Sequence, residues 1–238
     1  MATSYRPLGR AKRRGAPEDG HSGALRLKIA LAGEEYDKAA RALWGHRRFK
    51  QLVPDYLFRI HSIIRASVPV METALRRATS LAAKDAVAES LAAYLGQHIA
   101  EERHHDDWLL DDLEVLGISR DAIWSRMPSA TVAALVGSQY YWIHHHHPIA
   151  VLGYIAVLEG NPPLESDIAE VIQRTGLPTD AFRTFIKHAR LDPHHRDDLD
   201  AALDAMPLGE EHETLIATSA LETQHLLAVS LREVLGKT

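Results

Sequence analysis

Apolar side chains recur along most of the chain with the three- to four-residue spacing that places them on one face of an α-helix. The first such segment begins near Leu25 and ends near Gly45, with apolar positions at Leu25, Ile29, Leu31, Tyr36, Ala39 and Leu43. Alternation of β-branched and polar residues, together with hairpin turn signals, is nearly absent. The pattern therefore predicts an all-α protein.

Seven main helices are expected from this periodicity and from the glycines and prolines that interrupt it. After the first, they cover about residues 55–81, 84–116, 129–158, 164–174, 179–206 and 209–235, with a short helix at about 119–124. Pro69, Pro148 and Pro193 fall inside three of them and should bend or interrupt the helix, because proline lacks the backbone N–H. No linker or repeat divides residues 24–238, so the sequence predicts a single helical bundle.

Residues 1–23 differ from the rest, because they combine Arg, Lys, Gly, Pro and Ser with no apolar periodicity. A segment of this composition cannot bury enough apolar surface to fold by itself, so we expect a disordered, basic N-terminal tail. The tail could contact an acidic partner, although a solvated tail without such a role is the simpler interpretation. Residues 24–238 are then expected to form the folded domain.

The composition restricts the classes of function. Of the 238 residues, 46% are hydrophobic and the formal net charge is −5, so no basic face for nucleic acid is expected. The chain has no cysteine, which excludes disulfides, thiolate metal sites and a cysteine nucleophile. No secretory signal is visible, and the most apolar segment, residues 149–158, is about half the length needed to cross a bilayer. A cytoplasmic protein with no membrane partner is therefore expected.

Histidine is the unusual residue of the composition, with 15 in the chain. The segment HIAEERHHDDW, residues 98–108, places His98, Glu102 and His105 at positions i, i+4 and i+7 of an expected helix. Because each helical residue turns the chain by about 100°, these three side chains fall within about 60° of one another. Glu101 lies at the edge of that face, whereas His104 points away from it.

The same spacing occurs again in HARLDPHHRDD, residues 188–198, where it joins His188, Asp192 and His195. Imidazole and carboxylate groups together are ligands for iron, manganese or zinc. An acidic residue followed three positions later by histidine, on each of two facing helices, is the recurring device of di-iron bundles. A solvated acidic face with neighbouring histidines is the alternative for either segment alone. Because the pattern occurs twice, a metal site shared by the two helices is favoured.

Three further residues are candidates whose role the sequence leaves open. Glu159 ends the apolar run IAVLGYIAVLE, where a carboxylate is costly unless it is paired or metal-bound, but it could equally be the first polar residue after a buried helix. His144 and His145 belong to a run of four histidines and fall on roughly the same face as Glu159, provided that Pro148 does not rotate the helix too far. They could hydrogen-bond to metal ligands or contact substrate, and a structural role is equally consistent with the pattern.

Three segments together resemble the iron-containing, haem-oxygenase-like oxidases and oxygenases: HIAEERHHDDWLLDDLEVLG at 98–117, HHHHPIAVLGYIAVLEG at 144–160 and HARLDPHH at 188–195. They stand in the family's order and at similar separations, and the resemblance covers about residues 55–206. It implies a seven-helix bundle related in shape to haem oxygenase. It also implies two bound Fe(II) ions, with manganese as an alternative, no haem, and O2 as co-substrate.

The resemblance also assigns residues by position. It implies five metal ligands, which are His105, Glu159, His188, Asp192 and His195. The remaining ligand of the first segment is either Glu102 or Glu101. Members of the family commonly have a glutamate one or two turns before this histidine. In this chain the position seven residues before His105 holds His98 instead.

Several functions are compatible with this resemblance, because members of the family act on different small molecules. They perform N-oxygenation of amines, oxidative decarboxylation or fragmentation of amino acids, or oxidation of fatty-acid chains. The sequence does not choose among these substrates, and it leaves a homodimer open.

The alternative is a non-redox protein of the same architecture, either a TenA-like hydrolase or a helical binding protein whose histidines and acids are structural. A TenA-like hydrolase normally relies on a cysteine nucleophile, which this chain lacks. A haem enzyme would need a histidine at about residues 25–40, and none is there. Phosphate-binding, dinucleotide-binding and nucleophile-elbow motifs are also absent, so no organic cofactor is expected and no further catalytic residue is assigned.

Overall fold

The computed structural model describes residues 20–160 and 162–236 of the chain. Within these ranges the chain forms helices and no β-strand, which confirms the all-α prediction. Most of the predicted tail, residues 1–19, lies outside the described residues. The first helix begins at His21, three residues before the expected start of the folded domain.

The helices are more numerous than the seven expected. Their bounds are α1 His21–Ala32, α2 Glu34–Trp44, α3 Phe49–Leu81, α4 Ala86–Glu102, α5 His105–Val115, α6 Arg120–Ser125, α7 Ala130–His145, α8 Val151–Leu158, α9 Glu165–Thr175, α10 Arg183–Ala205 and α11 Glu210–Leu235, with 3-10 turns η1 Pro148–Ala150 and η2 Thr179–Phe182. Helices α3 and α10 continue through their internal prolines. None of the described helices combines the length and the apolar character needed to cross a membrane.

The excess over seven arises because three expected helices are each divided in two. The first divides at Gly33 into α1 and α2. The expected helix at 129–158 divides into α7 and α8, because Pro148 cannot donate a backbone hydrogen bond and the side chain of His147 instead accepts from the N–H of Ile149. The expected helix at 84–116 divides into α4 and α5 at Arg103 and His104.

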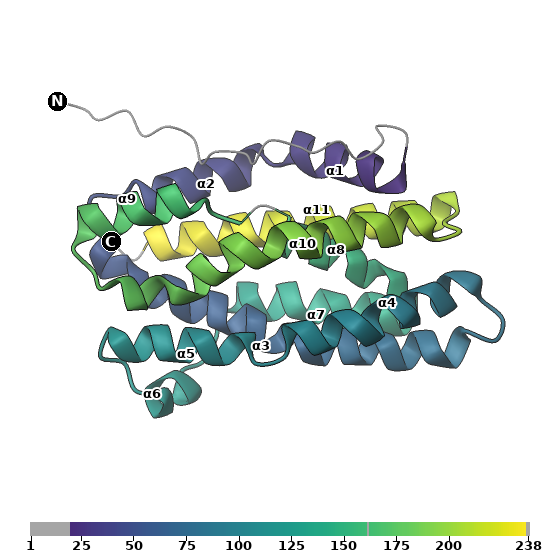
Figure 1. Ribbon diagram of the computed structural model, residues 1–238, viewed down its shortest axis with the longest axis horizontal. Coiled ribbons are helices and arrows are strands. Elements are labelled where there is room, and N and C mark those ends of the chain that lie inside the picture. The colour runs from purple at the N-terminus through teal and green to yellow at the C-terminus, as the bar shows by residue number, and fades with distance from the viewer. Residues whose placement is uncertain (1–19, 161, 237–238) are drawn as a thin grey trace.

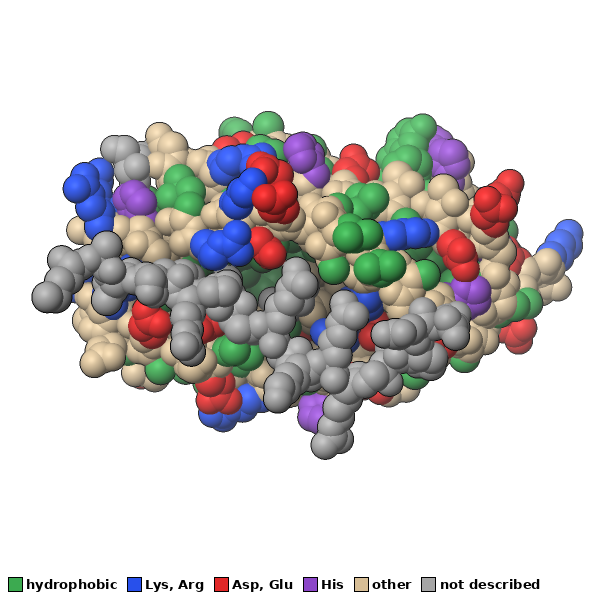
Figure 2. All heavy atoms as spheres, turned by 90° about the horizontal axis from the view of Figure 1, so that it is seen from above, with side chains coloured by type: hydrophobic (Ala, Val, Ile, Leu, Met, Phe, Trp, Pro, Cys, Tyr) green, Lys and Arg blue, Asp and Glu red, His purple; other side chains and the backbone are tan. Residues whose placement is uncertain are grey.

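The helices pack side by side in an elongated bundle (Figure 1). Helix α3 packs against α4, α5 and α7, whereas α11 packs against α8, α2, α7 and α1. Helix α10 crosses between these groups and contacts α1, α5 and α9. On the face viewed in Figure 2, acidic and basic side chains lie intermixed.

Two apolar clusters form the core, and the two histidine-acid motifs lie where these clusters meet. One cluster includes Ile99 of α4 and Leu199 of α10. The other includes Leu109 of α5 and Phe185 of α10. Residues 102–105 and 188–195 therefore lie between the two clusters along the same helices, where buried polar groups are shielded from water on both sides.

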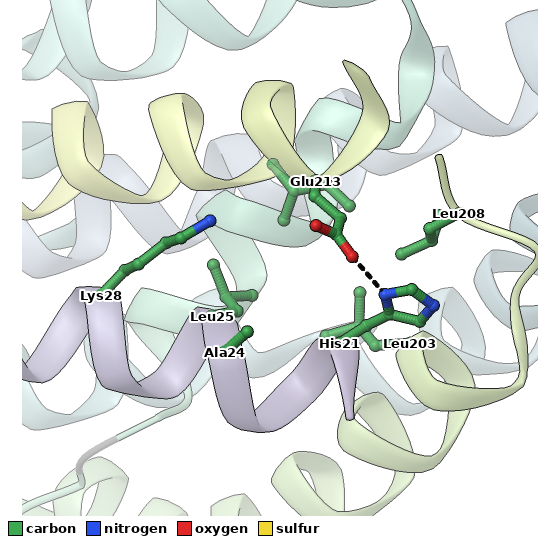
Figure 3. Close-up of a pocket in the computed structure, with 8 residues that line it drawn as sticks. His21, Ala24, Leu25, Lys28, Leu203, Leu208 and Glu213 are labelled. Atoms are coloured by element: carbon green, nitrogen blue, oxygen red, sulfur yellow. Dashed lines mark hydrogen bonds and ion pairs between the residues drawn. The ribbon is translucent and has the colours of Figure 1, made fainter. Parts of the chain in front are cut away.

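Helix α1 is tied to the rest of the bundle by buried polar contacts. The guanidinium of Arg26 donates to the carbonyl oxygen of Ala156 at 2.7 Å and to Asp200 at 2.9 Å. Nearby, His21 and Glu213 face one another at 2.5 Å beside a pocket of about 10 Å³, drawn in Figure 3. A pocket of this volume holds at most about one water molecule, so it offers no ligand site.

Helix α8 approaches α11 unusually closely at Gly153. A Cβ atom at this position would overlap the carbonyl oxygen of Ile216 and lie 2.7 Å from the backbone nitrogen of Ala220. Because both neighbours are backbone atoms of a long helix, they cannot move aside like a side chain. The absence of a side chain at Gly153 therefore sets the position of α8, and with it that of Glu159, which caps the end of this helix.

We expect Gly153→Ala to destabilise the fold by about 3 kcal/mol, because it forces α8 away from α11. Gly137→Ala on α7 is the matched control, since a Cβ there meets nothing within 4 Å. The control should raise stability by about 0.5–1 kcal/mol through its better helix propensity. Urea unfolding monitored by circular dichroism measures both. Equal stability of the two variants would show that α8 is not held by this contact.

Candidate metal centre

The helix that carries the first histidine-acid motif breaks inside that motif. Arg103 adopts an extended conformation with ψ of 135°, and His104 is left-handed with φ of 70°. Among the described residues, His104 is the one non-glycine residue with positive φ. The expectation of one continuous helical face from His98 to His105 was therefore wrong. Even so, Glu102 at the end of α4 and His105 at the start of α5 remain together, with His105 Nδ1 3.1 Å from Glu102 Oε2.

Glu102, His105 and His188 form one group that could hold a metal ion. They offer one ligand atom each, and these atoms all lie within 4.8 Å of one another. The Nδ1 atom of His188 donates to the carbonyl oxygen of Thr184 at 2.9 Å. Because that hydrogen bond fixes the proton on Nδ1, it leaves Nε2 as the free ligand atom and orients the ring.

His98, Glu102 and Glu159 form a second group under the same distance criterion. The Nε2 atom of His98 lies 3.0 Å from Oε1 of Glu159. Glu102 belongs to both groups, so its carboxylate lies between two candidate ion positions. A carboxylate has two oxygen atoms, and one can face each position.

His195 and Asp192 of α10 complete the cluster. The Nδ1 atom of His195 lies 3.3 Å from Oε1 of Glu102 and 3.9 Å from Oε2 of Glu159. Asp192 is 4% exposed. Its burial raises the pKa to about 9, and the negative charges of Glu159 and Glu102 add to the shift.

Several ligand-type atoms of this cluster are buried without a hydrogen-bond partner in the described structure. They are Oε1 of Glu102, Oε2 of Glu159, Oδ1 of Asp192 and Nδ1 of His195. Leaving such an atom unsatisfied costs about 1–3 kcal/mol. Three carboxylates and several imidazoles that converge on one buried volume are the donor set of a cation site, and bound cations would satisfy these atoms. The residues present therefore fit a pair of metal ions.

Burial and neighbouring charges shift the pKa values of the cluster in opposite directions. Burial raises the pKa of Glu159, although the contact with His98 opposes the shift. Burial also acts to raise the pKa of Glu102, but the hydrogen bond and charge of His105 outweigh it, so that the pKa is lowered. Burial acts to lower the pKa of His98, but Glu159 outweighs it and raises the pKa.

Three residues singled out from the sequence lie outside these groups. Glu101 is exposed and accepts a hydrogen bond from Gln97 at 3.2 Å. His144 and His145 are exposed at the end of α7, where the ring of His145 packs against Tyr141. The interruption at Pro148 separates α7 from α8, so the expected common face of these histidines with Glu159 does not form.

Two aromatic rings beside the cluster have contacts that the sequence did not single out. Tyr94 stacks on His98 with ring centroids 5.2 Å apart, and its hydroxyl is buried without a hydrogen-bond partner. Trp108 stacks on His105 at 4.1 Å, and Lys187 Nζ lies 3.7 Å from the centre of its ring. The only sequence signal for these two contacts is helical spacing, because Tyr94 precedes His98 by four residues and Trp108 follows His105 by three.

A family model described as an iron-containing redox enzyme matches residues 54–228 of the chain. No curated protein matches the chain significantly. The matched range contains every residue of the two candidate metal groups, so the family similarity and the geometry point to the same part of the molecule.

Solved structures share the fold at low sequence identity. A domain of unknown function with a haem oxygenase-like fold from Shewanella denitrificans gives a TM-score of 0.70 at 15% identity, covering 91% of this chain and 89% of that one. A TenA homolog from Pseudomonas syringae pv. tomato gives 0.69 at 12%, covering 94% and 98%. A CADD-like protein of unknown function from Nostoc punctiforme gives 0.68 at 17%, covering 91% and 96%. These similarities show a haem-oxygenase-like fold.

Proposed function

The chain belongs to the family of iron-containing redox enzymes, and from that premise we propose that it is a non-haem di-iron enzyme that uses O2 to oxidise a small organic substrate. The observation that carries the proposal is the shared carboxylate of Glu102, which stands in both candidate metal groups. A single structural ion would need only one such group. Two groups joined by one buried carboxylate are the arrangement of di-iron carboxylate bundles.

The proposed ligands divide between two positions. His105 and His188 would hold one Fe(II), His98 and Glu159 the other, and Glu102 would bridge them. Asp192 and His195 lie on the same helix as His188 and would complete the coordination from that side. Bound in this way, the iron pair would supply electrons to O2, and O2 would be the oxidant of the substrate.

The remaining chemistry belongs to the protein. The apolar clusters on either side limit the contact of the site with bulk water, which strengthens the electrostatic interactions there. Thr184 fixes the orientation of His188 through its backbone carbonyl. The buried hydroxyl of Tyr94 has no hydrogen-bond partner among the described residues, so it can donate a hydrogen bond to a group that enters beside His98.

We expect the Fe(II)-loaded protein to consume O2, and to do so faster when a suitable substrate is bound. The protein is loaded with Fe(II) without oxygen, and O2 uptake is followed with an electrode after mixing. Zinc-loaded protein is the control, because Zn²⁺ has no redox chemistry. His188→Ala should reduce uptake strongly, because it removes a ligand of one position. Binding of zinc alone, with no O2 uptake by iron-loaded protein, would contradict the proposal.

A non-redox function is the second candidate, because a TenA homolog is among the similar structures. The absence of cysteine removes the nucleophile that such a hydrolase normally uses. The O2-uptake experiment separates the two candidates, since a hydrolase or a binding protein would bind its ligand without consuming O2.

A further inference from the structure

A surface cleft leads to the candidate metal centre between α4 and α10. It has a volume of about 480 Å³ and is lined by residues of both helices. His98 lines it although only 2% of that residue is exposed, so the ring stands at the inner end of the cleft. A molecule in the cleft would therefore lie against a proposed iron ligand.

One part of the lining is apolar and built from small side chains. It consists of Ala93 on α4, Ala201, Ala202 and Ala205 on α10, and Met206 at the end of α10. Small side chains leave room between the two helices, and methionine adapts to the shape of its neighbour. This wall suits a short aliphatic chain.

The charged side chains that line the cleft are both acidic. Glu101 comes from α4 and Asp198 from α10, and neither lysine nor arginine is among the lining residues. Gln97 donates to Oε1 of Glu101, and Oε2 of Glu101 lies 3.9 Å from Nδ1 of His98, so this carboxylate lies beside the inner end of the cleft. The carboxylate of Glu102 lies beside His98 behind the inner end and would add to the negative potential in the absence of metal.

Tyr94 connects the acidic lining with the candidate metal centre. Its ring stacks on His98, and its hydroxyl is buried and without a partner. Burial raises the pKa of this hydroxyl, and the charges of Glu159, Asp198 and Glu101 contribute to the shift. The hydroxyl therefore lies within the electric field of both the acidic lining and the candidate ligands, and its oxygen can accept a hydrogen bond from a cation.

We propose that this cleft is the substrate site and that it selects a small molecule with a protonated amine on a short aliphatic chain, held by Glu101 and Asp198. The proposal rests on the proposed function, because it makes the amine the substrate of the iron pair. A carboxylate-bearing chain such as a fatty acid would meet the carboxylates of Glu101 and Asp198 and neither lysine nor arginine among the lining residues, so the lining would repel its head group.

The test compares three probes of equal chain length. The Zn²⁺-loaded full-length protein is titrated with n-hexylamine, hexanoate and 1-hexanol in a calorimeter. We expect the amine to bind at least about tenfold more tightly than hexanoate. Its affinity should also fall as salt rises from about 0.05 to 0.5 M, because the acids that hold it are near the surface. Hexanol should show no such salt dependence.

Charge-neutral variants identify the residues responsible. Glu101→Gln combined with Asp198→Asn should weaken n-hexylamine about fivefold and leave hexanol unchanged. The matched controls are Glu89→Gln on α4 and Asp197→Asn on α10, which are exposed acids on the same helices outside the cleft lining. Both controls should bind n-hexylamine like the unaltered protein.

Hexanoate binding as tightly as the amine would overturn the proposal, as would a double variant that binds n-hexylamine like its controls. Elemental analysis of every sample keeps this result separate from the proposed function. If zinc is bound but the amine preference is absent, the substrate assignment fails and the metal centre stands. If no sample binds zinc or iron, the di-iron function fails, and the same titration on the metal-free protein still reports on the cleft.

Discussion

Replacing Glu102 by glutamine is expected to abolish binding of both iron ions, whereas replacing other single ligands should remove only one. Glu102 stands in both candidate metal groups, and its side chain is 9% exposed. An amide has no charge and is a much weaker ligand, so the affinity at both positions should fall by more than about a hundredfold. We therefore expect about two iron ions per chain in the unaltered protein and well below one in Glu102→Gln.

Two further variants serve as comparisons for Glu102→Gln. Glu159→Gln changes a carboxylate that belongs to one group only, so it should retain about one ion per chain. Glu101→Gln changes the neighbouring exposed acid and should retain both ions. Elemental analysis after anaerobic loading with Fe(II) gives the stoichiometry. Loss of a single ion from Glu102→Gln would show that the carboxylate does not bridge, even if iron is bound.

Replacing Asp192 by asparagine is expected to stabilise the metal-free protein at pH 8 and to weaken the metal-loaded protein. Asp192 is buried, and its pKa is raised from the ordinary 3.8 to about 9. The folded chain therefore keeps a proton that the unfolded chain releases at about pH 4. The contribution of Asp192 to the free energy of unfolding is fully present below about pH 4. It is lost progressively as the pH rises toward about 9, because folding must then take up a proton.

Asparagine removes this dependence, since it never has to bind a proton. We expect Asp192→Asn to raise the stability of the metal-free protein at pH 8 by about 3 kcal/mol, which corresponds to about 6–12 °C in Tm for a chain of this size. With iron bound the sign should reverse, because the variant lacks a proposed anionic ligand.

Differential scanning calorimetry of the metal-free and the iron-loaded protein measures this reversal, over the range from about pH 5 to about pH 9 in which the stability should change. Asp197→Asn on the exposed side of α10 is the control and should change stability by less than about 0.5 kcal/mol. A metal-free Asp192→Asn protein less stable than the unaltered one at pH 8 would show that the carboxyl group is satisfied without metal.

Helical periodicity was enough to predict that some of the candidate side chains lie close together, whereas their role as metal ligands stays a prediction. His105, His188 and His195 could be identified because helical periodicity places residues three, four and seven apart on one face, and because the pattern occurred twice. The role of Glu159 stayed open, since local sequence does not reveal where a helix end points. Its position depends on how α8 packs against α11, which is a tertiary contact through Gly153.

The helix break at Arg103 and His104 could not be predicted for a different reason. Left-handed residues are usually glycine or asparagine, and both residues at this break are strong candidates for helical positions by pattern alone. The same limit applied to His144 and His145. Their expected face depended on a straight path through Pro148, whereas the chain instead forms a 3-10 turn there.

The break also determines what would have to be moved if this cluster were grafted onto another helical scaffold. Copying Glu102 and His105 onto a straight helix would keep their separation in sequence but lose the left-handed residue that sets their mutual direction. The backbone conformation of His104 would therefore have to be copied with the cluster, although its side chain is 81% exposed and faces Asp107. A designer could place glycine there to carry the same turn with less strain, by about 1–2 kcal/mol.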